Sequence, residues 1–177
     1  MNLANQITIA RILLIPFFVI AIAYYRPDTP FIKVIPSVIF FIASLSDAVD
    51  GYLARVRKEQ TAFGSFLDPF ADKLLLLSAF ISLAYSPYFA HKIPAWILIV
   101  IVSREILIIS GLLIFFFALG GVQIKPSFLG KLTTVVQMVT VGALLLQLNW
   151  ASLAAYGAAL LTIASGLGYV LREVRRV

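Results

Sequence analysis

Six apolar stretches, each close to the length of a membrane span, constrain the fold of this chain more than any other feature. They lie at about 7–25, 32–55, 68–87, 93–118, 129–148 and 150–171. A helix needs about 20 mostly apolar residues to cross the hydrocarbon core of a bilayer. Of the residues, 62% are hydrophobic and 12% are charged, whereas a soluble domain has about 45–50% and about 25%. The sequence therefore predicts an all-α polytopic membrane protein with six transmembrane helices in a single domain, residues 1–177.

The basic residues predict how these helices are oriented. Six spans place both termini on the same side of the membrane. On that side we expect Arg11, Arg55, Arg57, Lys58, Lys73, Lys125, Lys131, Arg172, Arg175 and Arg176, and on the other side Arg26, Lys33 and Lys92. Lysine and arginine are enriched in cytoplasmic loops. We therefore expect a multi-pass protein of the cell (inner) membrane with both termini in the cytoplasm.

The first span has an alternative interpretation as a cleaved signal peptide. Ala21-Ile22-Ala23 follows an apolar run and resembles a cleavage site. However, Asn5, Thr8 and Arg11 are spaced three apart and share one stripe of a helix. A retained helix that uses this polar stripe explains the three residues better.

Composition excludes several kinds of site. The chain has no cysteine and one histidine, His91. Disulfides, thiolate metal sites and a cysteine nucleophile are therefore excluded, and a histidine metal cluster or a Ser-His-Asp triad is not expected. The net charge of +6 is compatible with nucleic acid, but the basic residues lie at the ends of apolar runs, where they meet anionic lipid headgroups. We expect the lipid bilayer, and not nucleic acid, as the partner.

Four aspartates at the predicted membrane boundary are the most informative residues. Ionisable groups at this position are costly, which makes Asp47, Asp50, Asp68 and Asp72 functional candidates. The first two are three apart and the last two are four apart, so each pair shares a helix face. A turn over 55–65 would let the two pairs face each other across an antiparallel helix pair.

Four carboxylates in one pocket would repel strongly, and divalent cations would remove the conflict. Mg²⁺ prefers oxygen ligands and is commonly shared between carboxylates and substrate phosphates. Mn²⁺ accepts the same ligands. Two such ions could clamp the attacking and leaving oxygens of a phosphoryl transfer. A structural alternative is that Asp68 caps a helix whose first residue is Pro69, while Asp47 and Asp50 merely end the second span.

The segment from Asp47 to Asp72 follows the pattern D-x2-D-G-x2-A-R-x8-G-x3-D-x3-D. The fixed positions are Asp47, Asp50, Gly51, Ala54, Arg55, Gly64, Asp68 and Asp72. This pattern resembles the signature of the CDP-alcohol phosphotransferases (CDP-alcohol phosphatidyltransferases). The likeness covers nearly the whole chain, because that family also has six membrane helices with cytoplasmic termini. Its members often form dimers, so the resemblance also implies a homodimer.

The resemblance implies a role for each matching residue. Asp47, Asp50 and Asp68 would bind two metal ions, with Asp72 close to them and acting as the general base. Gly51, Ala54, Arg55 and Gly64 would shape the pocket for the cytidine diphosphate group, with Asn5 and Thr8 of the first span also placed there. The donor would be CDP-diacylglycerol, and CMP would leave towards the cytoplasm, where the active site faces.

The outer segments resemble one branch of the family, the bacterial phosphatidylglycerophosphate synthases, which use glycerol 3-phosphate as acceptor. The resemblance lies in Asn5 to Arg11, in Arg104-Glu105 and in the stretch Gly130 to Gln137. It implies that Arg104 and Lys131 bind the acceptor phosphate, and we add Arg11 as a third basic group. Arg104 must face a polar cavity or a partner, because it lies deep in the fourth span. We do not expect this partner to be Glu105, because adjacent helical residues point in different directions.

Other functions remain open. The branch usually carries a second arginine where this chain has Leu112 and Leu113, and a lysine where it has Thr133. The stretch from Lys125 to Gln137 also resembles the cardiolipin synthases, which use phosphatidylglycerol as acceptor. Another small alcohol, such as serine or inositol, fits less well, because uncharged inositol would not need Arg104 and Lys131. For Arg11 and Lys131 the structural alternative is interfacial snorkelling, and for Arg104 it is a buried ion pair.

Two alternatives come from outside this family. A cation transporter or channel would use the same four aspartates for a travelling ion, and a structural membrane subunit would not need them. Neither alternative explains the spacing of Gly51, Arg55 and Gly64.

Overall fold

The chain folds into a bundle of long helices. In this computed structural model, the residues described are 3–26, 28, 34–46, 62–89, 92–119 and 128–174. Six helices lie within these ranges: α1 (Leu3–Ala23), a shorter helix over Val34–Ser46, α3 (Ala62–Tyr85), α4 (Ala95–Leu119), α5 (Phe128–Leu145) and α6 (Ala151–Val174). The prediction of an all-α protein with six helices is confirmed.

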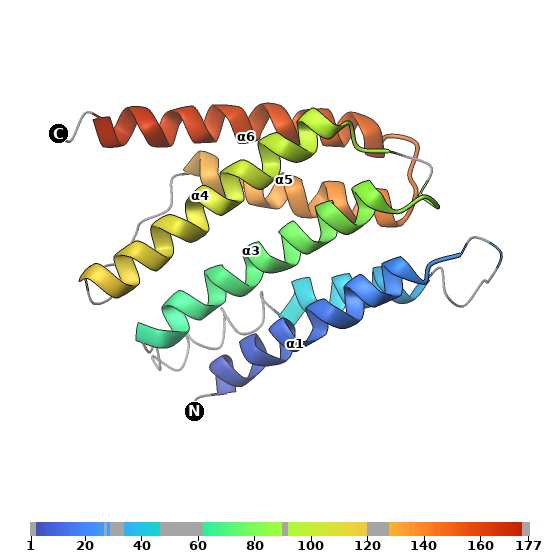
Figure 1. The fold of residues 1–177 in the computed structure, drawn as a ribbon, viewed down its shortest axis with the longest axis horizontal. Helices are drawn as coiled ribbons and strands as arrows, with labels where there is room; N and C mark the ends of the chain where they lie inside the picture. Colours follow the sequence, from blue (N-terminus) through green and yellow to red (C-terminus); the bar gives the residue numbers. More distant parts are fainter. Residues whose placement is uncertain are drawn as a thin grey trace.

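Helix α3 is the centre of the bundle. It packs against α1, α4 and α5, while α6 covers α4 and α5 (Figure 1). Helices α1, α3 and α5 begin at one end of the bundle, and α4 and α6 finish there. We call this end the terminal end, because the first residues of α1 and the last residues of α6 both lie at it. In α1, α3 and α5 the half nearer this end carries Asn5, Thr8, Arg11, Asp68, Asp72 and Lys131.

Apolar length and exposure identify the bundle as a membrane protein. Within the described residues, three helical segments are long and apolar enough to cross a membrane: Asn5–Ala23, Phe128–Leu145 and Ala151–Gly168. Val34–Ser46 is apolar but shorter. Large hydrophobic side chains such as Leu107, Phe117 and Leu153 are exposed on the outside of the bundle. A soluble monomer rarely exposes so much apolar surface, whereas lipid tails cover it at no cost.

Exposed aromatic side chains mark the end of the bundle opposite the terminal end. They are Tyr24, Tyr85, Tyr88, Trp96 and Trp150, from the last turns of α1 and α3, the start of α4 and the loops on this side. Tyrosine and tryptophan gather at the membrane–water interface, because their rings are apolar and their tips are polar. The opposite end of the bundle therefore lies at one membrane interface and the terminal end at the other.

Helix α3 begins earlier than the sequence predicts. The expected start was residue 68, but the helix begins at Ala62. Asp68 and Pro69 therefore lie inside the helix, and the alternative in which Asp68 caps it is wrong. A proline inside a helix removes one backbone hydrogen bond, and α3 continues through Pro69 to Tyr85. The second span was predicted to reach residue 55. Its helix is described to Ser46, and the residues after it lie outside the described part.

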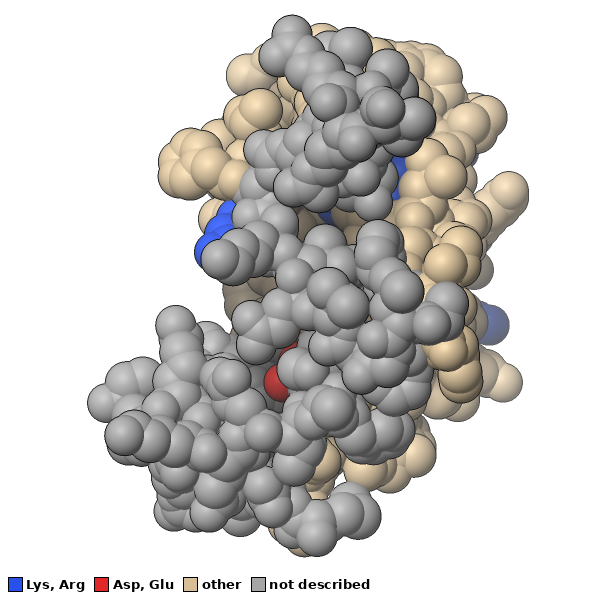
Figure 2. All heavy atoms as spheres, turned by 90° about the vertical axis from the view of Figure 1, so that its left-hand side faces the viewer, with Lys and Arg blue, Asp and Glu red and all other residues tan. Residues whose placement is uncertain are grey.

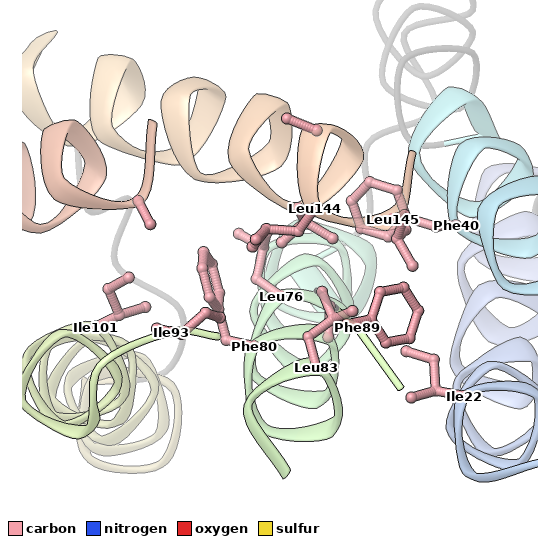
Figure 3. Close-up of a cluster of buried hydrophobic side chains, with 14 of the residues drawn as sticks. Ile22, Phe40, Leu76, Phe80, Leu83, Phe89, Ile93, Ile101, Leu144 and Leu145 are labelled. Atoms are coloured by element: carbon pink, nitrogen blue, oxygen red, sulfur yellow. The ribbon is translucent and has the colours of Figure 1, made fainter. Parts of the chain in front are cut away.

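The apolar core fills the bundle towards the opposite end. Ile22 of α1, Leu76 and Phe80 of α3 and Leu144 of α5 meet there and are almost fully buried (Figure 3). Phe89, from the loop between α3 and α4, closes this core and stacks on Tyr25 with ring centroids 4.5 Å apart. On α3, the core residues from Leu75 to Leu83 follow Asp68 and Asp72, which lie nearer the terminal end.

The turn between α5 and α6 is tied to the end of α1. Gln147 has a positive φ of 53°, and the Leu148 amide donates to the Ala143 carbonyl (3.0 Å), which is the Schellman pattern of a helix end. Glycine is the usual residue at this position. The glutamine has a second function here, because its side-chain amide donates to the Tyr25 hydroxyl at 2.7 Å.

We expect Tyr25→Phe to lower the free energy of unfolding by about 1 kcal/mol, the usual net worth of one hydrogen bond. The phenyl ring would keep its stacking on Phe89, so only the bond to Gln147 is lost. Thermal unfolding of the purified protein in detergent measures the change. Tyr24→Phe is the matched control, because Tyr24 is 72% exposed. Equal unfolding midpoints for the two variants would contradict this role of the Tyr25 hydroxyl.

Candidate active site

Helix α3 places two aspartates near the terminal end. Asp68 and Asp72 are four residues apart on one helix, so both side chains lie on the same face, and both are partly exposed. Gly64, one turn before Asp68, is buried. The predicted pairing of Asp68 with Asp72 on one face is therefore confirmed.

The polar stripe of α1 is directed inward. Asn5, Thr8 and Arg11 are all buried, and Thr8 and Arg11 are only 0% and 1% exposed. The Thr8 hydroxyl donates to Oδ1 of Asp68 at 2.5 Å. Helix α1 therefore holds one of the two carboxylates directly.

Arg11 links α1 to the helix that precedes the aspartate motif. Its Nε donates to the Ser46 hydroxyl at 3.3 Å, and that hydroxyl donates to the Ala43 carbonyl at 2.7 Å. Ser46 is the residue immediately before Asp47. Since the side chain of Arg11 is almost fully buried in the protein, interfacial snorkelling is the wrong explanation for it.

Three charged side chains from α3 and α4 meet inside the bundle. Arg104 Nη1 lies 2.5 Å from Glu105 Oε1, and Lys73 Nζ lies 3.1 Å from Glu105 Oε2. The expectation that Arg104 has a partner or faces a polar cavity is met, but the argument against Glu105 as this partner is wrong. The side chains leave the helix about 100° apart, yet both are long enough for their ends to meet.

The start of α5 completes this group. Arg104 Nη2 donates to the Gly130 carbonyl at 3.4 Å and to the Ser165 hydroxyl of α6 at 3.3 Å. Lys131, which follows Gly130 in the sequence, is exposed. Thr133, where the resemblance would place a lysine, is fully buried and donates to the Leu129 and Leu161 carbonyls. The residue at this position is therefore an uncharged threonine that contacts α6, and it adds no positive charge to the site.

Five of the thirteen predicted site residues lie outside the described part of the chain. These are Asp47, Asp50, Gly51, Ala54 and Arg55. Within the described part of the chain, no three acidic or histidine side chains are grouped closely enough to hold a metal ion. Asp68 and Asp72 supply oxygen donors only, which are the ligands that Mg²⁺ and Mn²⁺ prefer. The chemistry of this pair therefore fits a divalent metal.

Charged residues of both signs are visible on the surface of the terminal end. Figure 2 looks onto that end, and atoms of Asp or Glu residues are visible there, as are Lys and Arg atoms. Acidic and basic residues of the described part of the chain therefore lie on the same face of the bundle.

Sequence reasoning did not identify Lys73 and Glu105 as parts of this arrangement. Both are buried, with exposed fractions of 7% and 0%. The signal that could have found them is general: an ionisable residue within a membrane span needs a partner. With two cations and Glu105 as the nearby anion, a shared carboxylate is the expected solution.

Comparison with known proteins gives consistent results along almost the whole chain. The sequence model of the family described as CDP-alcohol phosphatidyltransferase matches residues 1–168. A protein of Haemophilus influenzae named CDP-diacylglycerol–glycerol-3-phosphate 3-phosphatidyltransferase is 43% identical, over 96% of this chain and 91% of the relative. Proteins with the same name from Bacillus subtilis and Escherichia coli are 39% and 36% identical, over 95% and 96% of this chain and 93% of each relative.

Proposed function

The chain belongs to the CDP-alcohol phosphatidyltransferase family, and we propose that it transfers a phosphatidyl group from CDP-diacylglycerol to glycerol 3-phosphate. The products are phosphatidylglycerol phosphate and CMP, and the reaction is a step of phospholipid biosynthesis. The acceptor hydroxyl attacks the phosphorus that carries the diacylglycerol. The bond from that phosphorus to the CMP oxygen breaks, and the hydroxyl proton is lost.

The observation that carries this proposal is the Asp68–Asp72 pair on α3. It lies at the interfacial end of a membrane bundle, and the Thr8 hydroxyl of α1 holds one of its members. A lipid donor with an anionic headgroup needs this combination of a bilayer and carboxylates that can carry metal at its edge. The choice of glycerol 3-phosphate is supported by the names of the relatives.

Enzymes of this family use a divalent metal. We propose that Asp47, Asp50 and Asp68 hold two Mg²⁺ or Mn²⁺ ions, with Asp72 close to them. When bound, the metal neutralises the charge of the pyrophosphate and so stabilises the displacement at phosphorus. Without metal, four aspartates near one another would repel the anionic donor.

The remaining residues have roles in binding and proton transfer. Asp72 accepts the proton of the acceptor hydroxyl. Gly51, Ala54, Arg55 and Gly64 form the pocket for the cytidine diphosphate group, with Asn5 and Thr8 on its α1 side. Arg104, Lys131 and Arg11 attract the phosphate of the acceptor. Of these three, Lys131 is exposed, so it is accessible to an acceptor that arrives from water.

We propose that the terminal end faces the cytoplasm and that residues 1–177 form one domain that works as a homodimer. Arg11, Lys73 and Lys131 lie in the half of the bundle near the terminal end, whereas Arg26 and Lys92 lie at the opposite end. This distribution favours a cytoplasmic terminal end, because basic residues are enriched on that side.

The acceptor can be tested with the purified protein, CDP-diacylglycerol and Mg²⁺. We expect CMP release with glycerol 3-phosphate and none above background with phosphatidylglycerol. The reverse pattern would instead make the protein a cardiolipin synthase. Metal flux across liposomes without nucleotide, and no CMP release with either acceptor, would indicate a transporter and contradict the proposed function.

A further inference from the structure

Five groups from three helices form a closed ring of polar contacts. Lys73 of α3 donates to the Thr134 hydroxyl of α5 at 2.8 Å, and Thr134 donates to the Gly130 carbonyl at 3.2 Å. The same carbonyl accepts from Arg104 of α4 at 3.4 Å. Arg104 pairs with Glu105 at 2.5 Å, and Glu105 returns to Lys73 at 3.1 Å. The ring joins α3, α4 and α5, and Ser165 attaches α6 to it.

The three charged members of the ring are buried and together carry a net positive charge. Lys73 and Arg104 are 7% and 8% exposed, and Glu105 is 0% exposed. One carboxylate serves both cations, because each of its oxygens faces a different one. Ionised groups inside a membrane bundle are costly unless they are paired. Removing Glu105 leaves Lys73 and Arg104 without their shared counterion. Removing Lys73 takes away the link from Glu105 of α4 to Thr134 of α5, so in either case the helices that carry the ring would shift.

The ring lies directly beside three residues of the proposed site. Lys73 follows Asp72, the proposed proton acceptor, and Gly130 precedes Lys131. Arg104 is itself a member of the ring. The contacts of the ring therefore determine how far Asp72 lies from Arg104 and Lys131, two of the three cations proposed to attract the acceptor phosphate.

The part of α3 that carries Asp68, proposed to act on the lipid donor, is held by a contact outside the ring. Asp68 is fixed by Thr8 of α1, and α1 and α3 pack directly against each other. Asp68 and Lys73 are five residues apart, so they point to different faces of α3. A disturbance of the ring should therefore affect the acceptor more than the donor.

From this arrangement we propose that Lys73 and Glu105 are positioning residues that set the acceptor subsite of the transfer reaction. They hold α3 against α4 and α5, so that the hydroxyl of an anionic acceptor reaches Asp72 while its phosphate stays near Arg104 and Lys131. This inference rests on the proposed function and adds two residues that do not touch the reacting atoms.

The test is steady-state kinetics of Lys73→Met and Glu105→Gln with glycerol 3-phosphate and CDP-diacylglycerol varied in turn. We expect the acceptor KM to rise about tenfold or more and kcat to fall about tenfold, because misplacing a reacting group by about 1 Å can cost a hundredfold. The donor KM should change by less than about twofold, since the contact between Thr8 and Asp68 remains. Lys73→Arg keeps the charge and several hydrogen-bond donors, so its acceptor KM should be close to the wild-type value.

Lys92→Met is the matched control, because Lys92 is exposed at the opposite end of the bundle. A purely structural role would reduce kcat in proportion to the folded fraction and leave both KM values unchanged. That result in Lys73→Met and Glu105→Gln would overturn the inference. If neither variant folds, Thr134→Val replaces them, because it removes the contacts of Thr134 with Lys73 and Gly130. A wild-type acceptor KM in Thr134→Val would likewise overturn the inference.

The outcome also separates this inference from the proposed function. A wild-type protein that releases CMP with glycerol 3-phosphate, together with unchanged acceptor KM values in the variants, contradicts only the positioning role. A wild-type protein that uses a different acceptor contradicts the proposed acceptor. The KM for that acceptor then tests the ring in the same way.

Discussion

Replacing Asp68 with asparagine should reduce the turnover number by about 10³-fold or more, because a metal ion supplies several kcal/mol of charge stabilisation in such reactions. The substitution removes a charge and almost no volume. The amide oxygen of asparagine can still accept the hydrogen bond that Thr8 donates to Oδ1. A loss of activity therefore reports the missing negative charge rather than a broken contact between α1 and α3.

The control for this variant is Asp28→Asn. Asp28 is exposed in the turn after α1, at the opposite end of the bundle. It undergoes the same chemical change and should keep wild-type turnover. CMP release is measured for both variants over a range of Mg²⁺ concentrations. Asp68→Asn with normal turnover at low Mg²⁺ would contradict metal binding by this aspartate, and Asp50→Asn extends the same test to the motif before α3.

Asp72→Asn should lower kcat by about 10²–10⁴-fold, the usual contribution of a positioned general base. Asp72 lies one turn after Asp68, and an amide in its place cannot take the proton of the acceptor hydroxyl. We expect the Mg²⁺ concentration for half-maximal rate to change little, since the other three aspartates would remain. The unchanged Mg²⁺ dependence distinguishes Asp72→Asn from Asp68→Asn, in which more Mg²⁺ or Mn²⁺ should recover part of the rate.

The measurement is kcat at saturating substrates and Mg²⁺, together with the Mg²⁺ titration of each variant. If Asp72→Asn kept its kcat and only required more metal, Asp72 would be a ligand and not the proton acceptor. If neither quantity changed, the carboxylate would have no part in the reaction.

The features that could be predicted from the sequence are those set by local periodicity. The spacing of Asn5, Thr8 and Arg11 predicts one polar stripe, and all three residues are buried. The spacing of Asp68 and Asp72 predicts a shared helix face, and both lie on α3. Each is a property of a single helix, so 3.6 residues per turn is enough to derive it.

The features that could not be predicted depend on contacts between helices or on competing local signals. Asp68 and Pro69 have the chemistry of a helix start, but α3 already begins at Ala62. The ring that joins Lys73 to Glu105 and Thr134 needs residues from three helices. Spacing along the chain contains no information on which helices pack together. For Arg104 and Glu105, the directions in which the side chains leave the helix predict no contact. Both side chains are long enough for their ends to meet.

The central claim is that the aspartates at the terminal end hold the divalent ions required for transfer. It is tested most directly by titrating Mn²⁺ into the purified protein with CDP-diacylglycerol present and following free Mn²⁺ by electron paramagnetic resonance. We expect the wild-type protein and Asp28→Asn to bind Mn²⁺ alike, whereas Asp68→Asn should lose most of this binding. Equal Mn²⁺ affinity in Asp68→Asn and the wild-type protein would contradict the claim.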